Sequence, residues 1–277
     1  MGEVIMLELY QFGNSVCVQK VRITLDEKGL DWKGHEVNLF TGEQYDPKYL
    51  KLNPKGVVPT LVVDGQAIIE STLICEYLDE TYPEPSLVPD DAVLRSRMRL
   101  WSKAVDEGLF EGVMDISFSA MFRERVKNMT DDQREQRFAN VGDPRRRDRV
   151  MSTFEQGVDS PFVFNGIAAY EKAFKNMEKD LASGGPWLLG SQFSLADINM
   201  MPFVNRLEYL GLLDIWIGKR PKVQEWWARA KQRPSFTRGI IDHFKPGEET
   251  EMQESGVKIR DQLAARYQSY LEQFPAI

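Results

Sequence analysis

The sequence predicts an α/β N-terminal domain followed by an all-α helical domain. Three observations indicate this: strand and helix signals alternate up to residue 83, a proline-rich segment (PEPSLVPDD) follows, and strand signals nearly vanish beyond it. The chain has 277 residues, enough for two hydrophobic cores at about 100 to 200 residues each. We expect domains at 1–83 and 94–245, a linker at 84–93, and a C-terminal extension with a helix at 246–277.

The first forty residues read as strand, helix and strand. Residues 6–10 (MLELY) form a short apolar strand, and 16–28 carry apolar residues at helical spacing up to Gly29. Residues 33–39 can form a second strand, which a helical crossover would place parallel to the first.

Two further strands and a helix complete this domain. Residues 60–63 and 67–69 flank Asp64-Gly65, a strong hairpin signal, and residues 71–80 form an amphipathic helix that prolines end. The resulting order, β-α-β followed by β-β-α, is the thioredoxin-like order.

Helical patterns fill the rest of the chain. The connection at 123–149 is polar and of mixed charge, and its basic run of Arg145, Arg146, Arg147 and Arg149 indicates a solvated segment. The last helix is polar and amphipathic, so it either packs across the body or extends away. The expected helices cover residues 94–122, 166–181, 195–213, 222–232 and 255–273.

Composition excludes several classes of function. The net charge of −7 and a pI near 5.1 disfavour nucleic acid or anionic membranes as the main partner. Two cysteines, Cys17 and Cys75, and two histidines are too few for a Cys/His metal site. No apolar run approaches the roughly 20 residues of a membrane span, and the start of the chain lacks a secretory signal. We expect a cytoplasmic protein without a metal.

The first motif with chemical meaning is Val57-Val58-Pro59-Thr60. A proline interrupts strand hydrogen bonding unless it lies at a strand start or an edge. An ordinary trans proline that opens the strand is one interpretation. A cis peptide is the other, and it would present the backbone N–H and C=O of Val58 to an extended ligand.

The second motif is Glu70-Ser71, where the hairpin enters a helix. The Ser71 hydroxyl and the first N–H groups of the helix suit a carboxylate, and Glu70 suits an ammonium, so the pair suits an α-amino acid head group. The alternative is that Ser71 is a plain N-cap.

The third motif is Gly13-Asn14-Ser15, between the first strand and the first helix. A Ser15 hydroxyl at the positive end of a helix would stabilise a thiolate. Cys17 is the competing nucleophile, or else a small apolar residue of the helix. A fourth pattern, Ser194 to Asp197 with Phe193 before it, is a capping box in its Asp form with a hydrophobic staple to Ile198, and it has a folding role.

This ordered set resembles the cytosolic glutathione transferase superfamily. Its members are Ser15, Asn53-Pro54-x-Gly56-x-Val58-Pro59, Glu70-Ser71 and the Ser194 to Asp197 box, and the resemblance covers almost the whole chain. It implies the glutathione transferase fold, glutathione as co-substrate, and a homodimer. It also implies that Ser15, with Asn14 beside it, hydrogen-bonds the glutathione sulfur.

The resemblance assigns further roles. It implies that Glu70 and Ser71 bind the γ-glutamyl end of glutathione and that Val58-Pro59 pairs with its cysteinyl backbone, with Gln44 and Lys55 as candidates for the glycine carboxylate. Val57 replaces the Gln or Lys that many members carry, which removes one polar contact. A hydrophobic substrate pocket is expected between the domains, with candidate walls at Phe12, Phe110, Met114 and Phe118.

One branch of the family looks most similar. Trp101 with Val105-Asp106-Glu107, and the long insertion before the helix at Gly166, resemble the bacterial β-aryl etherases, which cleave lignin-derived aromatic ethers. Two alternatives stay open: a thiol-disulfide reductase that uses Cys17 as nucleophile, and a non-catalytic binding module on the same fold. A pure scaffold has no physical need for an amino-acid head-group site at Glu70 and Ser71.

Overall fold

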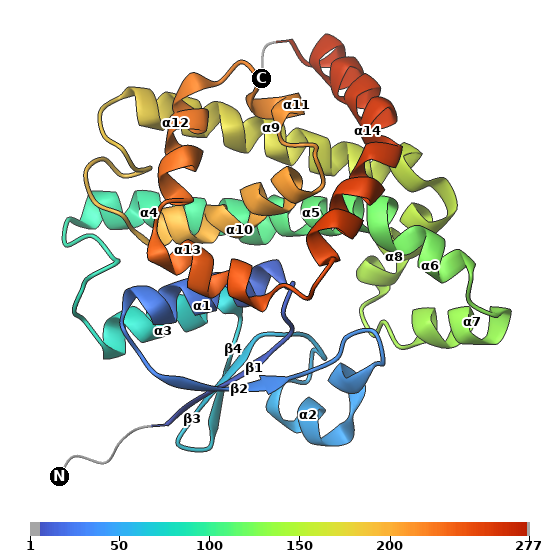
Figure 1. Ribbon diagram of the computed structural model, residues 1–277, viewed down its shortest axis with the longest axis horizontal. Helices are drawn as coiled ribbons and strands as arrows, with labels where there is room; N and C mark the ends of the chain where they lie inside the picture. The colour runs from blue at the N-terminus through green and yellow to red at the C-terminus, as the bar shows by residue number, and fades with distance from the viewer. Residues whose placement is uncertain (1–5, 276–277) are drawn as a thin grey trace. The chain divides into compact units, whose positions relative to one another are not determined.

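The fold is described from a computed structural model, which describes residues 6–275. Figure 1 shows the element order. The described residues form two compact units. Unit 1 holds residues 6–102, 185–202 and 227–245, and unit 2 holds 103–184, 203–226 and 246–275. The domain limits expected from the sequence stay a prediction.

Unit 1 contains a four-stranded sheet. Its strands are β1 (Leu7–Gln11), β2 (Trp32–Glu36), β3 (Thr60–Val63) and β4 (Gln66–Ile69), in the spatial order β2-β1-β3-β4. β1 is parallel to β2, and it is antiparallel to β3, which in turn is antiparallel to β4. This mixed sheet confirms the thioredoxin-like order expected from the sequence.

Helices cover this sheet. α1 (Val16–Glu27) and α3 (Ser71–Thr81) contact each other, and Figure 1 shows them side by side. α13 (Pro234–Gly239) packs on α1, while the short α2 (Pro47–Leu52) lies in the connection from β2 to β3. Apolar residues from the strands and from the inner faces of α1 and α3 form the core: Leu7, Leu9, Val18, Val21, Leu25, Leu61, Ile74 and Leu78.

The helix expected over residues 94–122 is interrupted twice. α4 (Ala92–Ala104) leads into a π-helical turn at Val105–Leu109, and α5 (Phe110–Ser117) leads into another at Phe118–Phe122. Each π-turn accommodates one extra residue in the helical ladder, which the i, i+4 pattern of the sequence does not reveal.

The expectation that residues 123–149 are solvated is largely confirmed, because most of them are exposed or half-buried, whereas the expectation that they form a connection is wrong. They fold into α6 (Arg123–Lys127), α7 (Asp131–Ala139) and the first part of α8 (Pro144–Gln156). The start signals were present: Thr130 and Gln133 form a capping box, and Asp143 caps α8 in front of a proline.

The basic run on α8 divides between solvent and core. Arg145 and Arg146 are exposed as expected. Arg149 instead pairs with Asp115 of α5, whose side chain is buried. Burial raises the pKa of Asp115 to about 6, against the opposing effect of Arg149. The charge pattern alone does not distinguish this buried partner from a solvated one.

Two helices of unit 2 approach each other closely. Gly112 of α5 and Gly166 of α9 (Pro161–Ala182) face each other, and a Cβ on Gly112 would lie 2.8 Å from the Gly166 Cα. Further along the chain lie α10 (Leu195–Tyr209), α11 (Asp214–Ile217), α12 (Pro221–Ala230) and α14 (Glu248–Gln273).

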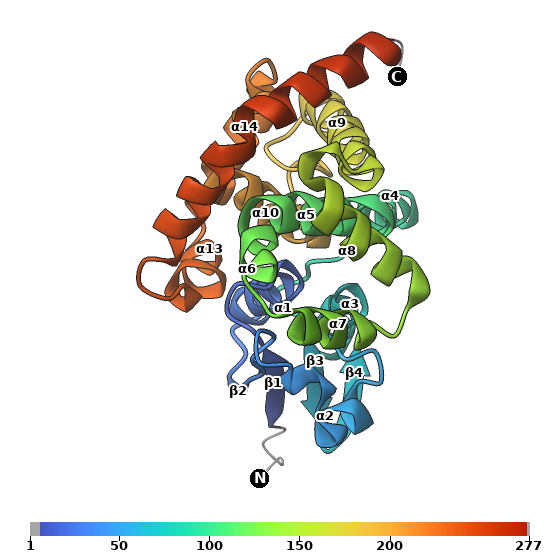
Figure 2. The ribbon, with the colours of Figure 1, turned by 90° about the vertical axis from the view of Figure 1, so that its right-hand side faces the viewer.

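The C-terminal helix α14 packs across unit 2 and does not extend away. Gln262 donates to Asp159 at 2.9 Å, and the Tyr267 hydroxyl donates to Glu171 of α9 at 2.6 Å. Figure 2 shows α14 crossing beside α9. Close backbone approach adds to these bonds, because Gly256 leaves room for the carbonyl of Leu210. Buried apolar residues such as Met252 and Leu263, together with these hydrogen bonds, hold the helix in place.

The acidic half of the predicted capping box at Ser194 is confirmed, and the staple between Phe193 and Ile198 stays a prediction. The Asp197 carboxylate accepts from the Ser194 N–H at 3.1 Å, and the Ser194 hydroxyl accepts from the Ala196 N–H at 3.3 Å. Asp197 also accepts from the Leu188 N–H at 3.0 Å, so the box fixes the preceding loop as well. Phe193 packs against Trp187, with ring centroids 4.7 Å apart.

The Gly112 contact yields a stability prediction. Gly112→Ala should lower the free energy of unfolding by about 1–3 kcal/mol, because the new methyl overlaps backbone that cannot move aside. Gly108→Ala is the matched control, since its methyl meets Ala169 at an ordinary 3.4 Å. Urea unfolding measures both. Equal midpoints for the two variants would show that α5 and α9 can separate without cost.

Candidate active site

The strand register brings three of the predicted motifs to one edge of the sheet. Tyr10 near the end of β1 pairs with Thr60 at the start of β3, and Thr60 pairs with Ile69 at the end of β4. The segments that continue from these positions carry Ser15, Val58-Pro59 and Glu70-Ser71. All three belong to unit 1, so the sheet itself sets their proximity.

Ser15 is the N-cap of α1. Its hydroxyl oxygen accepts from the Val18 N–H at 3.4 Å, and its side chain is partly exposed. An accepting hydroxyl keeps its own proton, which it can donate to an anion. No acidic residue lies in the first turn of α1, so the positive end of the helix is not offset there. Asn14 beside it is buried.

Cys17 lies in the first turn of α1, two residues beyond the cap. It is partly exposed, whereas Cys75 in α3 is fully buried. The helix therefore places Ser15 at its end and Cys17 within its first turn.

The Val58-Pro59 peptide bond is cis, the second of the two interpretations of this motif. Among the described residues, the Val58 backbone makes no hydrogen bond. The turn before it is fixed by Asn53, whose amide donates to the Val57 carbonyl at 2.9 Å, and by Tyr49, whose hydroxyl donates to the same carbonyl at 2.6 Å.

Tyr49 has a positioning role that the sequence analysis missed. Its hydroxyl also lies 2.9 Å from the Thr60 hydroxyl, and burial raises its pKa. The only signal in the sequence was an aromatic residue on the short polar helix α2. Tyr49 thus ties α2 to the turn that presents Val58.

Glu70, and not Ser71, occupies the N-cap position of α3. The alternative interpretation, in which Ser71 is a plain N-cap, is therefore wrong, and Ser71 is the first helical residue. Glu70 has φ 70°, a sparsely populated region for a residue with a side chain. Such strain costs about 1–3 kcal/mol and persists where the surrounding structure fixes it, often at functional sites. Since the Glu70 side chain makes no cap bond, its carboxylate is available to other partners.

Lys55 is one of those partners. Its ammonium lies 2.6 Å from the Glu70 carboxylate, and both side chains are about half exposed. Such an exposed pair contributes little to stability. Lys55 therefore lies directly beside the proposed head-group site.

Gln44 is buried near the same turn. Its backbone carbonyl and the Tyr45 ring press against Gly56, and its side-chain oxygen lacks a hydrogen-bond partner among residues 6–275. A buried amide with an unmet oxygen is one that a ligand or water can satisfy.

The candidate pocket residues fall in both units. Phe12 in unit 1 is buried and contacts the Phe40 ring, with centroids 5.4 Å apart. Phe110 and Met114 in α5 of unit 2 are 37% and 41% exposed, and Phe118 is buried. Phe110 and Met114 are four residues apart on one helix face, and both leave apolar surface uncovered.

The structure shows two further absences, each confined to the described residues. No group of His, Cys, Asp and Glu side chains in this part of the chain is arranged to hold a metal ion. Within the same residues, no helix is long and apolar enough to span a membrane.

A thioredoxin-like sheet with these motifs at one edge, together with a helical unit, defines a glutathione-handling fold. Family models agree: the glutathione S-transferase N-terminal domain matches residues 9–86, and the C-terminal domain matches residues 135–229. The chain belongs to the glutathione S-transferase family, and it is a glutathione S-transferase that uses glutathione as co-substrate.

Two of the similar proteins are a beta-etherase and a reductive dehalogenase according to their names. Protein LigF of Sphingobium sp. (strain NBRC 103272 / SYK-6) is 33% identical over 240 residues, covering 83% of this chain and 91% of LigF. The crystal structure of that protein, named a beta-etherase, matches with a TM-score of 0.76 at 29% identity, covering 85% of this chain and 99% of LigF. The tetrachloro-p-hydroquinone reductive dehalogenase of Sphingobium chlorophenolicum is 28% identical over 252 residues, covering 87% of this chain and 98% of the dehalogenase.

His243 gives a pH prediction for this site. Burial, and then the nearby Arg22 cation, lower its pKa to about 4, below the ordinary value near 6.5. Between these values the unfolded state binds more protons, so stability falls as the pH falls from about 6.5 to 4. His243→Gln should lose less stability than the wild type between pH 7 and 4.5 in urea unfolding. Parallel losses in both proteins would mean that His243 titrates normally in the folded state.

Proposed function

We propose that Ser15 activates the glutathione thiol of this enzyme for cleavage of β-aryl ethers in lignin-derived aromatics. The observation that carries the proposal is the position of the Ser15 hydroxyl at the N-terminus of α1, on the sheet edge that it shares with Val58 and Glu70. The similarity to the beta-etherase LigF supports the ether substrate.

Glutathione would bind along this edge. Glu70 accepts the ammonium of the γ-glutamyl end, and the Ser71 hydroxyl and the first N–H groups of α3 bind its carboxylate. The Val58 backbone, which makes no internal hydrogen bond among the described residues, pairs with the cysteinyl residue. Gln44 and Lys55 bind the glycine carboxylate, and Lys55 does so by leaving its pairing with Glu70.

The chemistry requires a thiolate. A free thiol has a pKa near 8.5, and each unit of depression corresponds to about 1.4 kcal/mol in favour of the thiolate. A hydroxyl donor and a helix N-terminus supply about one to two such units. The sulfur then attacks the carbon that bears the aryl ether: a C–S bond forms, the C–O bond breaks, and the phenolate leaves with the electron pair. The products are a glutathione thioether and a phenol.

The aromatic substrate needs an apolar wall. Phe110 and Met114 support this role because they are large, apolar and about 40% exposed on one face of α5. Phe12 and Phe118 are buried and would contribute through packing.

Glutathione titration of the purified protein tests the first half of the proposal. A saturable ultraviolet thiolate band at neutral pH is the expected result, followed by release of phenol from a β-aryl ether substrate. Binding without a band would favour the thiol-disulfide or binding-module alternatives. A band without phenol release would retain the transferase and reject the ether substrate.

Two variants distinguish Ser15, the proposed activator of the glutathione thiol, from Cys17, the competing nucleophile. Ser15→Ala should lower kcat/KM about 10- to 100-fold, because it removes one hydrogen bond to a charged sulfur. Cys17→Ser, two residues away on the same helix, should retain activity within about twofold. The thiolate band and phenol release measure both. A loss in Cys17→Ser with full activity in Ser15→Ala would assign the chemistry to Cys17.

We further propose that the protein forms a homodimer through α3 and α4. Leu73 of α3 and Leu100 of α4 are 58% and 62% exposed, and the ion pair between Arg99 and Glu76 joins the two helices beside them. Exposed apolar patches of this kind mark protein interfaces, and a two-fold interface would use the same patch twice.

Leu100→Glu should shift the protein from dimer to monomer in light scattering, because two like charges would face each other at the two-fold interface. Val257→Glu is the matched control, since Val257 on α14 is 61% exposed but lies on the other unit. A wild type that is monomeric at all concentrations would reject the dimer.

A further inference from the structure

The loop that carries Ser15 is held by a buried arginine. Arg22 lies on α1 seven residues after Ser15, which places it two turns further along the same face. Only 1% of its surface is exposed. Helical side chains lean toward the N-terminus, so the guanidinium reaches back to the loop before the cap.

The guanidinium group of Arg22 donates hydrogen bonds to three segments of the chain. Nη2 donates to the Gly13 carbonyl at 2.7 Å, Nη1 to the Gln11 side chain at 3.1 Å, and Nε to the Gly239 carbonyl at 2.8 Å. These partners lie in the loop before Ser15, at the end of β1, and at the end of α13. A lysine ammonium cannot reproduce this planar arrangement of donors.

The opposite side of Gly13 faces an acid. The Gly13 N–H donates to the Glu36 carboxylate at 3.4 Å, and the same carboxylate favours the charged form of Arg22. Burial lowers the pKa of Arg22 to about 9, so the group is still a cation at neutral pH. Gly13 is thus bound through its carbonyl by a cation and through its N–H by an anion.

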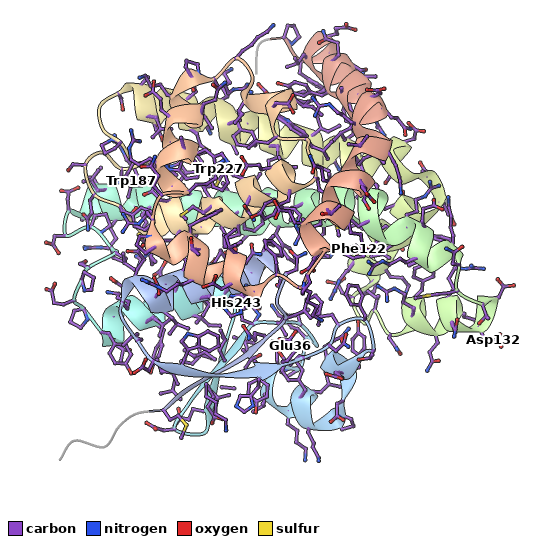
Figure 3. All side chains as sticks on the ribbon, in the orientation of Figure 1. Glu36, Phe122, Asp132, Trp187, Trp227 and His243 are labelled. Carbon is purple, nitrogen blue, oxygen red and sulfur yellow. The ribbon has the colours of Figure 1, made fainter. Side chains whose placement is uncertain are left out.

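A third contact, with the backbone of His243, also confines Gly13. A Cβ on Gly13 would lie 2.7 Å from the His243 carbonyl oxygen, so the turn at Ile241–His243 packs directly against it. Figure 3 labels His243 and Glu36, each of which interacts electrostatically with Arg22. The Lys245 ammonium lies 5.8 Å from the ring centroid of Phe12, the residue before Gly13.

We propose that Arg22 and Glu36 are positioning residues that hold the Gly13 peptide and thereby set the place of the Ser15 hydroxyl. The Gly13-Asn14 bond is trans, so a carbonyl fixed on Arg22 directs the Asn14 N–H to the opposite side. Ser15 follows directly, and its N–H donates to the Phe12 carbonyl at 3.0 Å, which closes the turn on the fixed peptide. The inference rests on the proposed role of Ser15 in thiolate activation.

The test compares Arg22→Met and Arg22→Lys with Arg233→Met. Arg233 also joins α13 to α1, through two bonds of 2.7 and 2.6 Å to Glu27, but within residues 6–275 it makes no hydrogen bond to the loop. A displaced hydroxyl should lower kcat about 10- to 100-fold and shift the thiolate titration toward that of free glutathione. KM for glutathione should change less than threefold, because Glu70 and Val58 remain in place. Arg233→Met should keep both kcat and the thiolate titration.

Arg22→Met leaves buried carbonyl groups without hydrogen-bond donors, which lowers the stability of the fold. A second variant therefore changes a residue on the surface. Glu36 is exposed, so Glu36→Ala should fold and should lower kcat about two- to fivefold with the same unchanged KM. Amide exchange of residues 12–19 in Arg22→Lys and Glu36→Ala should become faster, and in Arg233→Met it should not.

The outcomes separate this inference from the proposed function. A wild type without a thiolate band, or Ser15→Ala with an undiminished band, overturns the role of Ser15. A normal wild-type band that Ser15→Ala abolishes, combined with unchanged kcat and exchange in Glu36→Ala and in either folded Arg22 variant, overturns the positioning role alone. Equal losses in Arg233→Met and the Arg22 variants would also overturn it, because they would reflect only the docking of α13.

Discussion

The pairing of Tyr10 with Thr60 and of Thr60 with Ile69 is the constraint on which the active site depends. One cross-strand row aligns the end of β1 with the start of β3 and the end of β4. A shift of register by one residue would turn every side chain of a strand to the other face. The alternating burial of β1, with Leu7 and Leu9 buried, opposes such a shift, and the two-residue turn at Asp64-Gly65 sets the register of β3 with β4. Core packing therefore fixes the places of the thiol, backbone and head-group sites together.

The segments that follow this edge are held by polar groups, because an apolar core cannot orient a loop. Arg22 and Glu36 bind Gly13, while Tyr49 and Asn53 bind the carbonyl before Val58. Each of these bonds ends on a backbone atom next to a residue that would touch glutathione. The enzyme thus uses side-chain hydrogen bonds to backbone atoms for position, while the side chains of Ser15 and Glu70 stay accessible to solvent.

Much of this could be predicted from the sequence, because the signals were local. Apolar periodicity identified the strands and helices of unit 1, Asp64-Gly65 identified the hairpin, and the Ser194 box was confirmed in its reciprocal bond. The roles of Arg22 and Tyr49 were not predicted. Both depend on partners that are distant in sequence, such as Gly239 for Arg22, and nothing in a helical pattern shows where a long side chain ends.

The wrong expectations share a physical cause. The run of charged residues predicts a solvated connection, but Arg149 pairs with buried Asp115 and the segment folds as helices. Ser71 was considered as a cap, although the cap position belongs to Glu70, whose φ of 70° no propensity scale predicts for an acidic residue. At Arg149 a tertiary contact overrides the local preference for solvent, and at Glu70 a strained backbone overrides the local preference for a serine cap. Strain at Glu70 is informative for this reason: the chain adopts a costly conformation at the residue that would bind the ammonium of glutathione.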